Sequence, residues 1–112
     1  MTLDELADSF EERFSDPSLQ RLAELLRAWR LSAETVVTLR YQVEKFLGNV
    51  WLSDSVHVDA YSLWSLFIEK EVNQIQGMTM NERLWAFGLM ERFDAAGPAE
   101  QEVIYSKVLA KR

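Results

Sequence analysis

Hydrophobic and polar positions alternate at helical spacing along nearly the whole chain, starting at its third residue. Thr2 and Glu5 have the spacing of a capping box, which predicts a helix start directly before the first apolar positions. Asp16 and Pro17 predict the end of this helix and the start of a second, because aspartate is a favoured N-cap and proline a favoured first helical residue. The two helices are expected to turn these residues inward: Leu3, Leu6, Phe10 and Phe14, then Leu19, Leu22, Leu25, Leu26 and Trp29. The second helix is expected to present Arg21, Arg27 and Arg30 outward.

A third helix is predicted after Ser32, which is the expected N-cap, and it ends at Gly48-Asn49. Its inward positions are Val36, Leu39, Val43, Phe46 and Leu47. The stretch 50–58 is rich in β-branched and aromatic residues, and Val56-His57-Val58 alternates like a short strand. A lone strand would have no pairing partner in a helical chain, so the stretch is interpreted as an irregular connection or an early helical turn.

A long fourth helix is predicted to start at a cap formed by Asp54 or Asp59 and to run to about Gln76. Its expected inward residues are Ala60, Leu63, Trp64, Phe67, Val72 and Ile75.

The last third of the chain contains a second capping-box spacing, Thr79 with Glu82, and a Gly97-Pro98 boundary. They predict a helix that reaches Phe93 and a final helix that contains Val103, Ile104, Val108 and Leu109. Gly88 lies inside the first of these patterns, where a glycine costs about 1 kcal/mol relative to alanine. We expect it to allow the close approach of another helix, at Trp64 or Phe67, or to form a notch for a partner's side chain. The chain as a whole, residues 1–112, is predicted to be an all-α, compact single-domain bundle of five or six helices with short connections.

Composition excludes several kinds of chemistry. The 112 residues are 48% hydrophobic and 27% charged, which is typical of a globular protein, and they include no cysteine and one histidine. Disulfides, zinc–cysteine sites and thiol nucleophiles are therefore excluded, and His57 is interpreted as a partly exposed residue of a capping region. The four glycines are isolated, so no phosphate-binding loop is predicted. The sequence predicts neither an enzyme nor a cofactor or metal site.

The net charge of −6 is concentrated at the start of the chain, where residues 1–16 hold six acidic residues against Arg13 alone. This sign disfavours direct binding to nucleic acid or to an anionic membrane. The acidic start is either a solvated helix face or a patch that steers association with a basic protein partner, with Asp4, Asp8, Glu11 and Glu12 as the candidate residues. No apolar run approaches the about 20 residues of a membrane helix, and no cationic leader is present, so a cytoplasmic location is expected.

Aromatic residues are unusually frequent, with four Trp, three Tyr and six Phe. Most are expected in the core, but the residues from Leu84 to Phe93 cover more than one face of their helix. We therefore expect one exposed aromatic patch that includes Trp85, Trp51 or Tyr61. This patch is a candidate partner or self-association surface, and core packing alone is the other interpretation.

The segment Met80–Ala96 is similar to a stretch found in short bacterial proteins to which no activity is assigned. The matching elements are Asn81-Glu82-Arg83-Leu84, Gly88-Leu89 and Phe93-Asp94-Ala95-Ala96. In general type the chain also resembles small acidic bacterial immunity proteins and inhibitors. That resemblance implies a protein-binding module that neutralises or regulates a protein partner by occlusion. The alternative is a structural helical protein that forms a homodimer or larger homo-oligomer and has no catalytic site.

Overall fold

The computed structural model describes residues 1–110, which fold into seven α-helices and contain no β-strand. The helices are α1 (Leu3–Arg13), α2 (Pro17–Leu31), α3 (Val36–Asn49), α4 (Asp54–Phe67), α5 (Met80–Ala86), α6 (Met90–Asp94) and α7 (Pro98–Lys107). The all-α prediction is confirmed. The count is seven rather than five or six because the helix predicted after Thr79 is divided into α5 and α6.

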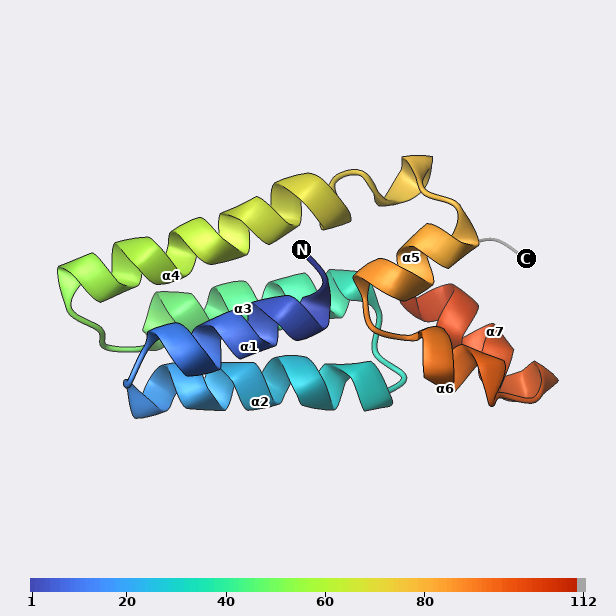
Figure 1. Ribbon diagram of the computed structural model, residues 1–112, viewed down its shortest axis with the longest axis horizontal. Helices are drawn as coiled ribbons and strands as arrows, with labels where there is room; N and C mark the ends of the chain where they lie inside the picture. The colour runs from blue at the N-terminus through green and yellow to red at the C-terminus, as the bar shows by residue number, and fades with distance from the viewer. Residues whose placement is uncertain (111–112) are drawn as a thin grey trace.

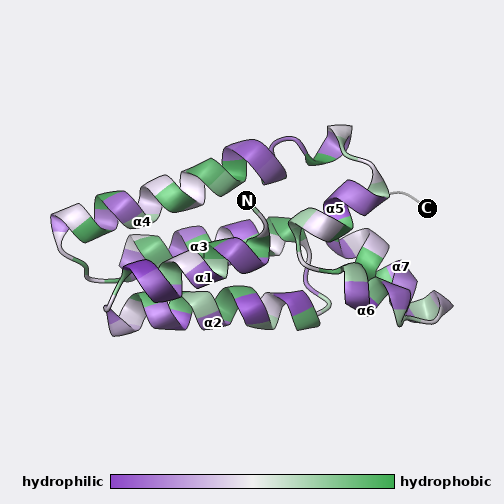
Figure 2. Cartoon of the chain, in the orientation of Figure 1, coloured by the Kyte–Doolittle hydropathy of each residue, from purple (hydrophilic) through white to green (hydrophobic). Residues whose placement is uncertain are grey.

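The four longer helices, α1 to α4, run roughly along the long axis of a molecule that measures 45 × 24 × 21 Å (Figure 1). Helices α5, α6 and α7 gather at one end. Hydrophobic and hydrophilic stripes alternate along the long helices, as amphipathic patterning requires (Figure 2). Most of the predicted inward residues are buried: Leu3, Leu6, Phe10, Leu19, Leu22, Leu26, Trp29, Val36, Leu39, Val43, Leu47, Ala60, Leu63, Trp64, Phe67 and Ile75.

Four helix starts are confirmed. Thr2 and Thr79 each form a complete capping box with the glutamate three residues later. Pro17 and Pro98 occupy the first helical positions of α2 and α7. These signals act within one turn of the chain, so the local sequence is enough to specify them.

The predicted cap at Ser32 is wrong, because Ser32 ends α2 and Thr35 begins α3. The Ser32 backbone N–H and hydroxyl both donate to the Trp29 carbonyl, at 3.0 and 2.8 Å. The Thr35 hydroxyl accepts from the backbone N–H of Thr38 at the start of α3. Both are hydroxyl residues near a helix boundary, and which of them serves as the N-cap depends on where the backbone of α2 leaves the helix.

The interpretation of residues 50–58 is confirmed, since 50–53 are irregular and α4 begins at Asp54. The N-cap is Ser53, so the expected caps Asp54 and Asp59 are wrong. The helix was also predicted to run to about Gln76, but its α-helical part ends at Phe67. Residues Ile68–Val72 then form a π-helical turn and residues Ile75–Gly77 a 3₁₀ turn.

Gly88 lies between helices rather than inside one. Its φ of +69° is a left-handed conformation that L side chains rarely adopt, and it ends the helical run after α5. A Cβ placed there would lie 2.7 Å from Asp4 Oδ2 and 3.1 Å from Arg30 Cδ. The expected approach at Trp64 or Phe67 is therefore wrong, and the close contact is with α1 and α2.

The three short helices are held by cationic side chains as well as by apolar contacts. Lys107, at the end of α7, is fully buried and donates to the Trp29 and Glu34 carbonyls and to the Ser32 hydroxyl. Its Nζ also lies 3.7 Å from the centre of the Trp29 ring. A cation at the C-terminal end of α2 is favoured by the helix dipole as well as by these hydrogen bonds.

Two arginines add to this docking. Arg92 of α6 donates to the carbonyls of Arg30 and Ser32, at 2.9 and 2.8 Å. Arg83 of α5 donates to the Val108 carbonyl at 3.0 Å, just beyond the end of α7. Carbonyl groups that a helix end leaves unpaired thus receive donors from elsewhere in the fold.

Candidate functional site

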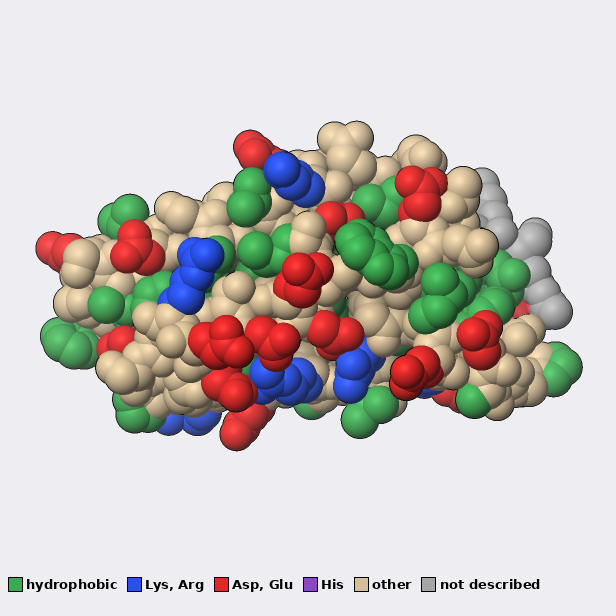
Figure 3. Space-filling view, in the orientation of Figure 1, with side chains coloured by type: hydrophobic (Ala, Val, Ile, Leu, Met, Phe, Trp, Pro, Cys, Tyr) green, Lys and Arg blue, Asp and Glu red, His purple; other side chains and the backbone are tan. Residues whose placement is uncertain are grey.

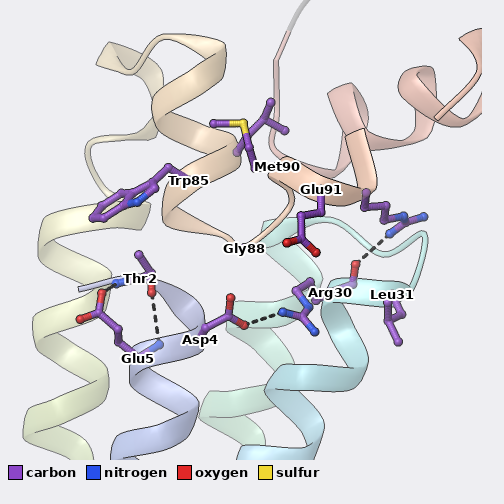
Figure 4. A pocket seen from close by; sticks show the side chains of 11 residues that line it. Thr2, Asp4, Glu5, Arg30, Leu31, Trp85, Gly88, Met90 and Glu91 are labelled. Atoms are coloured by element: carbon purple, nitrogen blue, oxygen red, sulfur yellow. Dashed lines mark hydrogen bonds and ion pairs between the residues drawn. The ribbon is translucent and has the colours of Figure 1, made fainter. Parts of the chain in front are cut away.

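A groove of about 560 Å³ lies where the start of α1, the end of α2 and the connection between α5 and α6 meet (Figure 4). We call it the Trp85 groove. It is lined by Thr2, Asp4, Glu5, Arg30, Leu31, Leu84, Trp85, Gly88, Met90, Glu91 and Arg92.

Three large apolar side chains surround this groove and are exposed to solvent. Leu31 is 72% exposed, Trp85 58% and Met90 37%, and they come from α2, α5 and α6 respectively. Exposed apolar residues that lie singly are ordinary, whereas several around one concave surface are typical of an interaction site. Tryptophan and methionine are also enriched in protein interfaces.

Gly88 positions the two sides of the groove. Because it has no side chain, the α5–α6 connection lies directly against the Asp4 and Arg30 side chains. In Figure 4, Trp85 lies over Thr2 and Glu5, while Glu91 points toward the Asp4–Arg30 pair. The groove thus depends on a backbone conformation that favours glycine.

Both arginines of the groove already have acidic partners. Arg30 Nη1 lies 2.9 Å from Asp4 Oδ1, and Arg92 Nε lies 3.0 Å from Glu100 Oε1. The carboxylate of Glu91, by contrast, forms no hydrogen bond or ion pair with any other residue in the range 1–110.

Glu5 is a second carboxylate of this groove that forms no ion pair with any residue in the described part of the chain. The Thr2 backbone N–H donates to its Oε1 at 3.0 Å, and this bond, with the contact to the Thr2 hydroxyl, lowers the pKa of Glu5. Glu5 therefore stays ionised at neutral pH. The uncompensated charge of the groove is negative.

The acidic residues predicted to steer a partner are largely paired inside the molecule. Arg27 of α2 binds both Asp8 and Glu11, and these bonds, Glu11 first, raise the pKa of its guanidinium. The expectation that Arg27 points simply outward is corrected, since it reaches across to α1. Figure 3 shows acidic side chains gathered over α1 with basic ones beside them over α2. Glu12 is exposed and has no ion-pair partner among residues 1–110.

The predicted aromatic residues do not share one surface. Trp51 is 86% exposed and lies in the α3–α4 connection, at the opposite end of the molecule from α5 and Trp85 (Figure 1). Tyr61 is half-buried, with its ring centre 4.8 Å from that of His57. The His57 Nε2 in turn lies 3.1 Å from the Leu47 carbonyl oxygen.

Of the predicted site residues, the structure brings only Asp4 and Trp85 together in the Trp85 groove. Leu31, Met90 and Glu91 were not predicted. The surplus of apolar residues between Leu84 and Phe93 was a signal for the exposure of Met90. No comparable signal marked Leu31, because its exposure depends on where α2 ends.

Within residues 1–110, no group of three or more histidine, aspartate or glutamate side chains is arranged to hold a metal ion. In the same range, no helix has the length and apolar character needed to cross a membrane. Comparisons with protein-family models, with curated proteins and with solved structures found no match to this chain.

Proposed function

We propose that this protein is a small acidic protein-binding module that regulates a protein partner by occluding part of its surface, and that it binds through the Trp85 groove. One observation carries the proposal. Leu31, Trp85 and Met90 come from three different helices, yet their exposed side chains converge on one groove.

The energetics favour a macromolecular partner. Burying apolar surface contributes about 25 cal/mol for each Å² removed from water, so a few large side chains can dominate the affinity of an interface. The groove is also pre-organised, because Gly88 lets the α5–α6 connection lie against Asp4 and Arg30, and the half-buried Arg92 bonds α6 to the end of α2. A rigid surface loses little conformational entropy when it binds.

Site-specific photo-crosslinking in the source cell tests the proposal. A photoreactive amino acid replaces Leu31 in one variant and Val37 in a matched control. Val37 is a similarly exposed aliphatic residue, at 63%, but it lies on α3 outside the groove. We expect position 31, and not position 37, to form a discrete covalent adduct with a second, different protein.

Two results would count against this function. Adducts of position 31 with another copy of this chain alone would favour the homo-oligomeric alternative. Equal labelling from positions 31 and 37, or none from either, would mean that the groove is not a specific protein-binding surface.

A further inference from the structure

The charge of the Trp85 groove indicates which part of a partner it recognises. We infer that the groove binds a basic side chain, arginine or lysine, that projects from an otherwise apolar segment of the partner protein. This inference rests on the proposed function and specifies the chemistry of the partner at the same site.

The first argument is the charge left unpaired. Glu91 has no ion-pair partner within residues 1–110, and in the same range the Glu5 carboxylate has no ion-pair partner and accepts a hydrogen bond from the Thr2 backbone N–H. Two free carboxylates beside an apolar rim favour a cation that can be partly removed from water.

The second argument is the exposed ring of Trp85. In Figure 4 it lies on the same side of the groove as Glu5, with Glu91 across from it. A guanidinium or ammonium group over an indole face is stabilised by the ring's quadrupole. The aliphatic stem of the same side chain, and the apolar residues next to it, would contact Met90 and Leu31.

The third argument is that the groove is poorly suited to an anion. Arg30 is paired with Asp4, and Arg92 is committed to Glu100 and to two carbonyls at the end of α2. An anionic ligand would have to displace these bonds and would also face the free carboxylates.

A synthetic peptide of alternating arginine and leucine residues provides a direct test, with a control peptide that has citrulline in place of arginine. Citrulline has nearly the same shape as arginine but no charge. Binding to the purified chain is followed by the NMR signal of the Trp85 indole N–H, assigned with W85F. We expect the arginine peptide to shift this signal, and the citrulline peptide to bind about tenfold more weakly.

Variants of the chain sharpen the test. E91Q should weaken the arginine peptide several-fold, whereas E69Q, which removes an exposed carboxylate outside the groove, should leave its affinity unchanged. Raising the salt concentration from about 0.05 M to about 0.5 M should weaken binding to the wild type more than to E91Q.

Equal affinity for the two peptides, an unchanged affinity in E91Q, or a shift of the Trp51 indole signal instead would overturn the inference. The two proposals can fail separately. Position 31 could crosslink to a partner whose affinity is the same for the wild type and E91Q and does not change with salt concentration. In that case the protein-binding function stands and the basic-side-chain inference fails. If the arginine peptide binds but no partner crosslinks, the recognition chemistry stands and the function fails.

Discussion

The bundle of long helices, α1 to α4, and the end formed by α5, α6 and α7 are stabilised by different interactions. Helices α1 and α2 bury a continuous series of leucine, alanine and aromatic side chains against each other and against α3 and α4. Helix α6, in contrast, has five residues and none that is buried, and α7 buries only Ile104 and Lys107. Besides the apolar contacts around α5, the short helices depend on buried or half-buried cations that donate to carbonyl groups of other elements.

This difference has a consequence for the Trp85 groove, which lies at the boundary of the two regions. Apolar packing tolerates substitutions that conserve side-chain volume, whereas hydrogen bonds from a buried cation are directional and costly to lose. Single polar substitutions should therefore destabilise the α5–α7 end more than equivalent substitutions on the α1–α2 surface.

The largest expected effect is a dependence of stability on pH. Burial, and secondarily the positive charge of Arg92, lower the pKa of Lys107 from 10.5 to about 8. Between these values the unfolded chain binds more protons than the folded one, so the free energy of unfolding should rise with pH across this window. The full rise from Lys107 should be roughly 3 kcal/mol, at about 1.4 kcal/mol for each pKa unit.

Urea unfolding of the wild type and of K107M, at pH 7 and at pH values through this window, measures that contribution. Other groups that titrate in the window cancel in the comparison of the two proteins. The same pH dependence in both would contradict the assignment to Lys107.

At neutral pH, K107M should destabilise the fold by about 2 kcal/mol, because the Glu34 carbonyl loses the Lys107 donor and the Ser32 hydroxyl keeps only the Glu34 backbone N–H. The matched control is K45M on α3, where the ammonium of an exposed lysine lies 5.9 Å from the centre of the Tyr41 ring and has no ion-pair partner among residues 1–110. That variant should lie within about 0.5 kcal/mol of the wild type. Equal losses in the two variants would remove the distinction between the two ends of the molecule.

Gly88→Ala should cost about 1–2 kcal/mol in thermal or urea unfolding, because alanine is strained at positive φ and its Cβ would meet Asp4. Gly48→Ala is the control, since Gly48 is helical and has open space around its Cα. It should be neutral or stabilising by up to about 1 kcal/mol. In the double variant D4A/G88A the contact between the Cβ at position 88 and Asp4 is removed, but the backbone strain at positive φ remains. A return of the free energy of unfolding to the wild-type value would therefore contradict this account.

The smallest effect is expected on the α1–α2 surface. R27Q removes the ion pairs with Asp8 and Glu11, but all three side chains are solvent-accessible. The loss should be at most about 1 kcal/mol and should shrink at high salt. A larger, salt-independent loss would show that polar contacts stabilise the α1–α2 pair as much as they stabilise the α5–α7 end.

The parts of the fold that could be predicted are those set by neighbouring residues. The capping boxes at Thr2 and Thr79 and the proline starts of α2 and α7 involve contacts within one helical turn. The break at Gly88 could not be predicted in the same way, because its contacts are with Asp4 and Arg30 on remote helices. The contacts of Lys107 could not be predicted either. From its sequence position we expect it to interact with the C-terminal end of its own helix, but its hydrogen-bond partners lie on and just after α2.

The residues of the candidate site likewise fall into those that the sequence could indicate and those that depend on contacts between remote helices. Trp85 and Asp4 stood out by residue type and charge, and both line the groove. The exposure of Leu31 depends on where α2 ends, and the lack of a partner for the Glu91 carboxylate among the described residues depends on how α6 is placed against α2. The internal pairing of Asp8 and Glu11 likewise required the position of Arg27 on the neighbouring helix.

The most direct test of the account compares the two highly exposed tryptophans at opposite ends of the molecule. The dissociation constant of the protein that crosslinks at position 31 is measured for the wild type, W85A and W51A. We predict that W85A weakens binding about tenfold or more, as loss of a central tryptophan anchor does, while W51A leaves it unchanged. Weakening by W51A with no effect of W85A would contradict the account and place the binding surface at the α3–α4 end.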